Sequence, residues 1–221
     1  MNRNYKEIYD ESLKNPEEFW QKVSEDVFWF KKPTKILKKD NPPFYKWFED
    51  GVTNTCYNAL DLHIDQGRGD KTALIYDSPI TESKAKFTFK ELKEKVSKFA
   101  GALDKQGVKK GDRVIIYMPM IPEAVVAMLA CGRIGAIHSV VFGGFASNEL
   151  ASRIDDSKAK ILITASCGFE PGRTVEYRPL VDGALKLAKH QVEKVILFQR
   201  KGHEVKLNKP LEISWDEALS G

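Results

Sequence analysis

Two glycine-containing segments hold residues whose types and spacing could bind an anion. In the first, an apolar run ending at Phe142 meets Gly143 and Gly144, and a helical pattern begins at Ser147. A strand, a glycine turn and a helix start commonly bind phosphate, because the backbone can approach closely and the helix N-terminus is partly positive. A plain turn capped by Ser147 suits the same residues, and Glu149 in the first helical turn would oppose an anion. The motif alone favours the plain turn.

The second segment, CGFEPGR, directly follows the apolar run ILITAS and contains Glu170, Pro171, Gly172 and Arg173. In open α/β sheets, ligands bind beyond the carboxyl ends of the strands. A flexible turn beside the forked Arg173 cation suits a phosphate or a nucleotide ring. Glu170 is the obvious local partner of Arg173, and the segment alone favours this self-satisfied surface loop.

Other candidates for chemistry are weaker. His138 lies in an apolar run, which favours a core histidine over a catalytic base. Asp155 and Asp156 point in different directions on a helix end, which favours solvated or capping roles. The three scattered cysteines form no CxxC pair and indicate a reducing compartment without disulfides or zinc. The sequence therefore predicts neither a catalytic residue nor a metal site.

Composition and charge exclude several classes of protein. The 35 Lys and Arg residues nearly balance the 31 Asp and Glu residues, giving a net charge of +4. The lysines are dispersed, so no nucleic-acid partner follows. The stretch EAVVAMLACGRIGAI is too short and interrupted to span a bilayer. The acidic, apolar-poor N-terminus resembles no signal peptide, and we expect a cytoplasmic protein without a membrane partner.

The first 55 residues differ from the rest and predict a helical N-terminal extension that packs on the main body. Helical spacing of apolar residues predicts helices over 5–14 and 16–30, the second with Pro16 in its first turn. A connector rich in lysine and proline, 31–43, is expected to run extended over the surface.

Residues 56–221 alternate between strand and helix patterns. We expect a helix over 56–66, two strands at TALIYD and KFTF, a long helix ending at Gly107, and then repeated strand–helix pairs. The strands after Gly111 are short apolar runs, typical of a parallel sheet covered on both faces. The pattern predicts an α/β fold with helices on both faces of the sheet. No GxGxxG follows the first strand, which disfavours a nicotinamide-dependent oxidoreductase.

Three passages together resemble the short-chain acyl-CoA synthetases of the adenylate-forming superfamily. They are the run from GDRVIIYM to ILITAS (111–166), the segment NPPFYKWFEDGVTNTCYNALDLHI (41–64), and the helical residues 4–50. The form NTCYNA, 54–59, is more similar to propionyl-CoA synthetases than to acetyl-CoA synthetases. The resemblance implies the parallel-sheet N-terminal subdomain of the adenylate-forming fold, preceded by a helical extension.

The resemblance also implies an activity, that of an acid–thiol ligase. A carboxylate such as propionate or acetate attacks ATP, with Mg, to give an acyl-adenylate and pyrophosphate, and the thiol of CoA then displaces AMP. The loop from Glu170 to Arg173 would contact the nucleotide end of CoA, and the turn 142–144 would lie beside its pantetheine and adenine. Glu170 stands where acetyl-CoA synthetases commonly have a basic residue, so only a backbone contact is inferred there.

Several parts of that family's pattern do not occur in these residues. The phosphate loop ending in Pro-Lys-Gly, the later acidic ATP-binding motifs, the acyl pocket and the catalytic lysine are absent. We therefore expect an N-terminal fragment of a ligase, inactive alone, with an incomplete AMP-binding domain. The alternative is a short protein that binds CoA or a partner without catalysis. A partial sheet leaves strand edges unpaired, so we expect dimerisation through an exposed edge or apolar patch.

Overall fold

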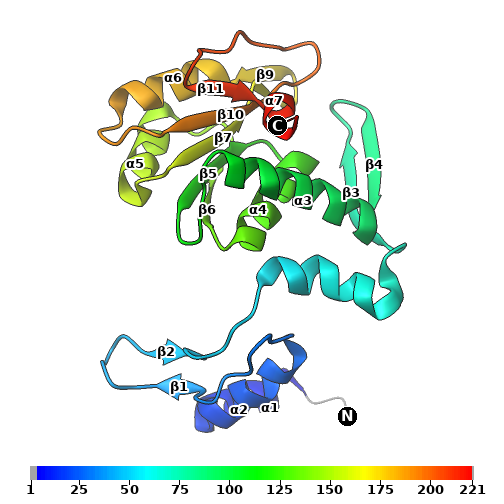
Figure 1. Ribbon diagram of the computed structural model, residues 1–221, viewed down its shortest axis with the longest axis vertical. Helices are drawn as coiled ribbons and strands as arrows, with labels where there is room; N and C mark the ends of the chain where they lie inside the picture. The colour runs from blue at the N-terminus through cyan, green and yellow to red at the C-terminus, as the bar shows by residue number, and fades with distance from the viewer. Residues whose placement is uncertain (1–3, 221) are drawn as a thin grey trace. The chain divides into compact units, whose positions relative to one another are not determined.

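The computed structural model describes residues 4–220 and divides into two compact units after Asn54 (Figure 1). This division falls one residue before the boundary that the sequence predicts. Residues 1–3 and 221, which the predicted domains include, lie outside the described part.

The first unit begins with two helices, α1 (Tyr5–Lys14) and α2 (Pro16–Val23). The predicted helix over 16–30 is wrong beyond Val23, where a short 3-10 turn, η1 (Ser24–Asp26), follows. The Ser24 hydroxyl donates to the Gln21 carbonyl at 2.6 Å, and the Ser24 carbonyl accepts from Trp29 Nε1 at 2.8 Å. These bonds satisfy the end of the helix and favour a turn over another helical repeat.

The lysine-rich connector is more ordered than the predicted extended surface segment. It contains β1 (Leu37–Lys38), which pairs antiparallel with β2 (Lys46–Trp47). Ile36 and Leu37 are buried within this unit. The connector is also held by polar contacts, because Thr34 donates to the Asp50 carboxylate at 2.7 Å and Lys38 pairs with Glu49 at 3.0 Å.

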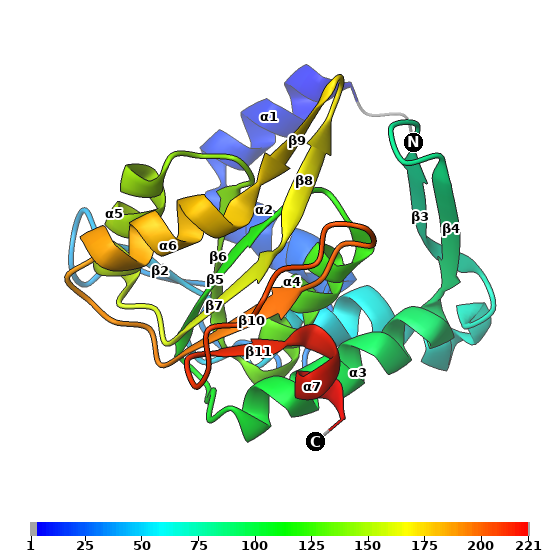
Figure 2. The same ribbon diagram turned by 90° about the horizontal axis from the view of Figure 1, so that it is seen from above.

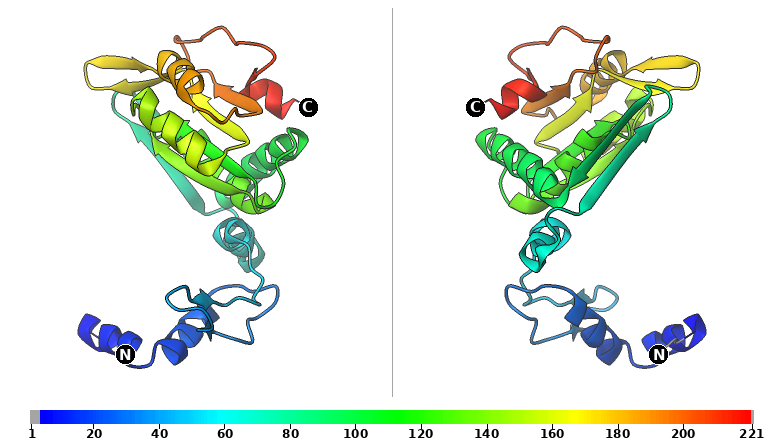
Figure 3. Two further views of the ribbon diagram at one scale, coloured as in Figure 1. Left: turned by 90° about the vertical axis from the view of Figure 1, so that its left-hand side faces the viewer. Right: turned by 90° about the vertical axis from the view of Figure 1, so that its right-hand side faces the viewer.

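The second unit is built on a five-stranded parallel sheet with strand order β11-β10-β7-β5-β6. The strands are β5 (Arg113–Met118), β6 (Ile137–Phe142), β7 (Ile161–Ala165), β10 (Lys194–Phe198) and β11 (Glu212–Ser214). Helices α3 (Phe89–Lys105), α4 (Pro122–Ile134) and α7 (Trp215–Leu219) lie on one face, and α5 (Ser147–Ser157) and α6 (Tyr177–Leu187) on the other (Figures 1 and 3). The predicted α/β fold with helices on both faces is confirmed.

The burial of the strands corrects one part of that prediction. Strands β5 and β7 are almost wholly buried, as short apolar runs predict. Strand β6 is the last in the sheet, and its Ile137, Val140 and Phe142 are exposed by 56%, 53% and 69%. His138 on the same strand is exposed too, so its predicted place in the core is wrong. No described strand lies beyond β6 to cover these side chains.

A helical segment and a hairpin precede the sheet in the second unit. The segment has two wide π-helical stretches, η2 (Tyr57–Asp61) and η3 (Ile64–Arg68). The hairpin consists of β3 (Thr72–Ser78) and β4 (Ser83–Thr88), as the two predicted strands require. Buried Asp61 pairs with Arg133 of α4 at 2.6 Å and with Lys93 of α3 at 2.9 Å, fastening the segment to both helices.

A second hairpin, which was not predicted from the sequence, follows β7 after a single intervening residue, Ser166. It consists of β8 (Cys167–Glu170) and β9 (Arg173–Glu176), with Pro171 and Gly172 at its tip. Figure 2 shows this hairpin projecting from the carboxyl end of the sheet. The segment CGFEPGR is therefore part of a paired two-stranded ribbon rather than an irregular loop.

Candidate functional site

A cavity of about 370 Å³ brings the two glycine-containing segments together at the carboxyl ends of the strands. Phe142 and Gly143 from the first segment and Glu170 from the second line it. Gly144 adjoins it, because a Cβ there would stand 3.9 Å from Glu170 Oε1. Pro171, Gly172 and Arg173 are not part of the lining and lie farther out on the hairpin.

The other lining residues come from the end of β5 and the loop after it, the β3–β4 hairpin, β6, the starts of β8 and α6, and the segment after β10. They include Tyr76, Asp77, Ser78, Pro79, Ile80, Met118, Pro119, Met120, Ile121, Val140, Val141, Gly168, Phe169, Tyr177 and Arg200. This wall is mainly apolar with a few polar groups, the usual character of a small-molecule site.

Tyr177 explains two of the glycines around the cavity. A Cβ on Gly143 would stand 2.1 Å from Tyr177 Oη and 2.9 Å from the Met118 carbonyl oxygen. A Cβ on Gly168 would stand 2.9 Å from the same hydroxyl. Both positions need glycine for packing, whether or not a ligand binds.

A second tyrosine, Tyr117 of β5, holds the turn after β6 through its hydroxyl group. Tyr117 Oη donates to the Phe145 carbonyl at 2.8 Å and accepts from the Gly144 amide at 3.2 Å. Burial raises the pKa of both Tyr117 and Tyr177, so both phenols stay neutral and Tyr117 keeps the proton that it donates to Phe145. The Gly144 amide is engaged in this contact, which weakens the case for a phosphate cradle here.

Ser147 does not cap the helix that follows, so that prediction is wrong. Ala146 is the capping residue of α5 and provides no side-chain bond. The Ser147 hydroxyl instead donates to the Leu180 carbonyl at 2.9 Å and packs against Gly183 of α6. The serine thus joins α5 to α6, because the close approach of the two helices at Gly183 brings the Leu180 carbonyl within reach of its hydroxyl.

The charges at the tip of the β8–β9 hairpin satisfy each other. Arg173 donates to Glu170 Oε2 from Nε at 2.7 Å and from Nη2 at 2.6 Å. The Arg173 side chain is 71% exposed and that of Glu170 is 41% exposed. This is the self-satisfied arrangement that the segment alone favours, and it cancels the charge of Arg173 toward an anion.

Two important residues of the cavity, Phe169 and Arg200, are not among the site residues predicted from the sequence. The Arg200 guanidinium carbon lies 4.7 Å from the centroid of the Phe169 ring. His203 meets the same ring edge-on, with centroids 5.1 Å apart. Arg200 follows the β10 strand, so its place beyond a strand's carboxyl end could have revealed it. Nothing in the sequence marks Tyr177, which reads only as part of a helix.

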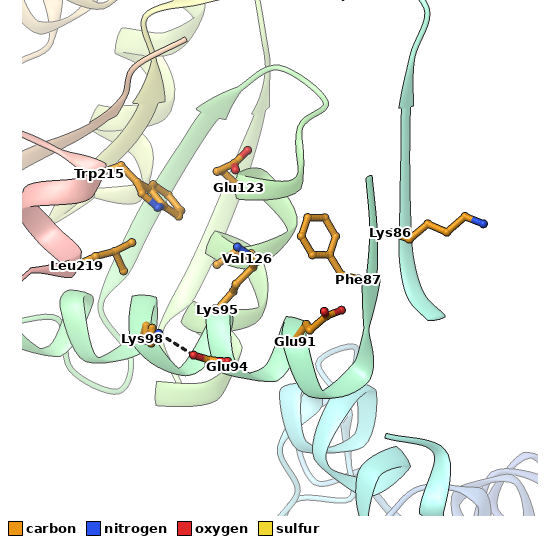
Figure 4. A pocket seen from close by; sticks show the side chains of 10 residues that line it. All are labelled: Lys86, Phe87, Glu91, Glu94, Lys95, Lys98, Glu123, Val126, Trp215 and Leu219. Atoms are coloured by element: carbon orange, nitrogen blue, oxygen red, sulfur yellow. Dashed lines mark hydrogen bonds and ion pairs between the residues drawn. The ribbon is translucent and has the colours of Figure 1, made fainter. Parts of the chain in front are cut away.

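A different cavity of about 410 Å³ lies between β4, α3, α4 and α7 (Figure 4). Lys86, Phe87, Glu91, Glu94, Lys95, Lys98, Glu123, Val126, Trp215 and Leu219 line it. Lys98 pairs with Glu94 at 2.7 Å, and Glu91 accepts from the Thr88 amide at the start of α3. Burial raises the pKa of Glu123. Glu91, Glu94 and Lys98 thus stabilise α3, and the cavity contains none of the residues that the sequence selects as a site.

Several other features bear on chemistry. Cys56, Cys131 and Cys167 are free and buried, and burial raises the pKa of Cys131 to about 12, which keeps it a thiol. Residues 4–220 hold no cluster of three or more metal-binding side chains. Among the helices of the same residues, none has the length and apolarity to cross a membrane.

Comparisons with known proteins place the chain in a family. Residues 63–217 match the family described as AMP-binding enzyme, and residues 5–59 match the acetyl-coenzyme A synthetase N-terminus. The chain is 54% identical to acyl-CoA synthetase short-chain family member 3, mitochondrial, of Homo sapiens over 98% of this chain and 32% of that protein.

Two further relatives agree with this placement. An acetyl-coenzyme A synthetase of Streptomyces avermitilis is 46% identical over 96% of this chain and 32% of that protein. The solved acetoacetyl-CoA synthetase from Streptomyces lividans is 26% identical, with a TM-score of 0.86, over 100% of this chain and 33% of that one. The chain thus spans about a third of the length of these relatives. It belongs to the AMP-binding enzyme family and corresponds to the N-terminal third of short-chain acyl-CoA synthetases.

Proposed function

We propose that these residues are the N-terminal part of an ATP-dependent short-chain acyl-CoA synthetase and form part of its CoA site. The observation that carries this proposal is the 370 Å³ cavity, which joins the turn 142–144 to the Glu170 end of the hairpin. The names of the relatives, which are acyl-CoA and acetyl-CoA synthetases, support the same activity.

The cavity suits the chemistry of CoA. Met118, Ile121 and Phe142 supply apolar surface for the pantetheine arm, and Gly143 lets the arm approach the backbone. The hairpin tip, with Gly172 and Arg173, would lie against the nucleotide end. Because Glu170 already engages Arg173, we propose that the tip contributes mainly backbone and packing contacts.

The residues described do not suit the triphosphate of ATP. A site for ATP and Mg needs backbone amides and a lysine that neutralise developing charge on the phosphates. The Pro-Lys-Gly loop that would supply them is absent from this sequence. We propose that ATP and Mg bind to parts of the enzyme outside these residues, and that the chain alone is inactive.

Propionate is the proposed acyl substrate, with acetate second. The support is the NTCYNA form at 54–59, which resembles propionyl-CoA synthetases. Competition between the two acids for acyl-CoA formation by the natural protein measures this preference. An acetate preference would contradict the propionyl assignment.

The activity is tested by ATP–pyrophosphate exchange with propionate, using the natural protein and residues 1–221 side by side. We expect exchange and CoA-dependent propionyl-CoA formation only with the natural protein. Exchange by residues 1–221 would overturn the claim that the chain is inactive alone. A native polypeptide of 25 kDa on an immunoblot would instead favour a binding module without catalysis.

The exposed edge strand supports a proposal about association. Val140 and Phe142 on one face of β6, and Ile137 on the other, are exposed beside unpaired backbone groups. We propose that residues 1–221 alone form homodimers through this edge. Sedimentation at high concentration tests this, and a monodisperse monomer would contradict it.

The compartment is also a proposal. Three free, buried cysteines suit a reducing compartment such as the cytoplasm, whereas the human relative is named mitochondrial. We propose a cytoplasmic enzyme, and recovery of the natural protein in an organelle fraction would contradict it.

A further inference from the structure

A second cavity of about 520 Å³ adjoins the proposed CoA site. The linings of the two cavities share four residues, Tyr76, Ile121, Phe169 and Arg200, so the cavities meet at these side chains. The second cavity runs between the β3–β4 hairpin and the end of β10. Lys84 of β4 and Lys201, which follows Arg200 in the chain, also line it. A ligand longer than one cavity could therefore extend from the first into the second.

Arg200 stands at the junction with its charge uncommitted. No carboxylate of residues 4–220 forms an ion pair with it. Its guanidinium instead lies over the Phe169 ring, at 4.7 Å from the centroid. An arginine that contacts a ring through its face keeps its in-plane N–H groups free to donate, and these match the oxygens of a phosphate.

The other charges near the junction do not cancel Arg200. Lys84 is paired with Asp77 at 3.0 Å, so that pair adds no net charge. Glu170 is engaged by Arg173. Glu123 also lines the second cavity, where burial raises its pKa, and it forms no ion pair with Arg200. Lys201 is exposed and adds positive charge to Arg200.

We propose that Arg200 forms an anion subsite at this junction and binds a phosphate group of the CoA nucleotide. The proposal rests on the proposed function. It assigns the recognition of negative charge to Arg200, because Arg173 at the hairpin tip is already neutralised by Glu170. Phe169 positions the guanidinium by stacking beneath it.

The test compares CoA, dephospho-CoA and inorganic pyrophosphate as ligands of the natural protein by calorimetry. The variants are Arg200→Met, Arg200→Lys and the control Lys98→Gln, which removes one positive charge from the separate cavity of Figure 4. We expect Arg200→Met to weaken CoA binding about 10- to 100-fold, the usual effect of losing a charge-assisted hydrogen bond. Arg200→Lys should recover part of the loss, and Lys98→Gln should change binding by less than about twofold.

The outcomes separate the subsite from the proposed function. If Arg200→Met weakens CoA but not dephospho-CoA, the subsite binds the 3′-phosphate, and if it weakens both equally, it binds the diphosphate. Unchanged CoA affinity in a folded Arg200→Met protein overturns the subsite while leaving the CoA site intact. Failure of the unaltered protein to bind CoA overturns the proposed function. In that case, NMR of the Arg200 Nε–H group during titration with pyrophosphate tests the anion subsite independently. A shift of this signal supports the subsite, and a signal that does not move overturns it.

Discussion

The turn after β6 and the tip of the β8–β9 hairpin look alike in sequence and differ in what holds them. Each has a glycine with positive φ, +92° at Gly144 and +76° at Gly172. The turn is fixed from inside, because Tyr117 bonds its backbone and Tyr177 fills the space beside Gly143. The tip is fixed by its own ladder and by an exposed ion pair, with open space around Gly172.

This difference shows why glycine in a candidate ligand loop has two separate explanations. At Gly143 the constraint is a neighbouring side chain, and the residue would be glycine in the absence of any ligand. At Gly172 the constraint is the backbone angle alone. Substitutions can separate these explanations if they test the steric overlap at Gly143 and the positive φ at Gly172 independently.

The largest effect is expected from Gly143→Ala. Its Cβ would overlap Tyr177 Oη and crowd the Met118 carbonyl, so we expect a loss of about 3 kcal/mol in the free energy of unfolding. Urea denaturation measures it. Adding Tyr177→Phe, which removes the overlapping hydroxyl, should recover part of the loss. A double variant no more stable than Gly143→Ala would contradict this explanation.

Tyr117→Phe should have the next largest effect. It removes the hydroxyl that donates to the Phe145 carbonyl and accepts from the Gly144 amide, leaving both backbone groups short of a partner. We expect a loss of about 1–2 kcal/mol by thermal denaturation. Tyr45→Phe, at a side chain exposed by 51%, is the matched control and should be neutral. Equal effects at the two tyrosines would show that the turn is not held from inside.

Gly172→Ala is expected to cost about 1 kcal/mol, because an alanine at φ +76° is strained although nothing lies within 4 Å of its Cβ. The same denaturation assay measures it. A cost as large as that of Gly143→Ala would remove the distinction between the turn and the tip.

The smallest effect on stability is expected from Glu170→Gln. Both partners of its ion pair are largely exposed and solvent screens them, so the change should stay below about 0.5 kcal/mol. Freeing Arg173 should raise CoA affinity about threefold in calorimetry. A marked fall in affinity would mean that the carboxylate itself serves the ligand.

The sequence predicted the sheet well because its strong signals are local. The runs at β5 and β7 are mostly apolar and lie buried, and Gly107, the predicted end of the long helix, follows α3 with φ +83°. The exposure of β6 could not be predicted, because its run IHSVVF resembles the buried strands and only strand order leaves it at an edge. The end of α2 at Val23 was missed because apolar spacing continued past the turn at Ser24.

The site was predicted in part. Phe142, Gly143 and Glu170 line one cavity, so the two selected segments do meet. Tyr177 and Arg200 were missed because their roles depend on which strand ends lie side by side, and that order follows from tertiary packing. Ser147 was misassigned because its hydroxyl found the Leu180 carbonyl of a helix 33 residues away in sequence.

The central claim is that the cavity joining the turn to the hairpin binds CoA. Hydrogen exchange of the natural protein, measured with and without CoA, tests it most directly. We expect CoA to slow exchange in residues 142–145 and 167–176 and to leave residues 86–98, beside the cavity of Figure 4, unchanged. Unchanged exchange at both segments, or slowing confined to residues 86–98, would contradict the account.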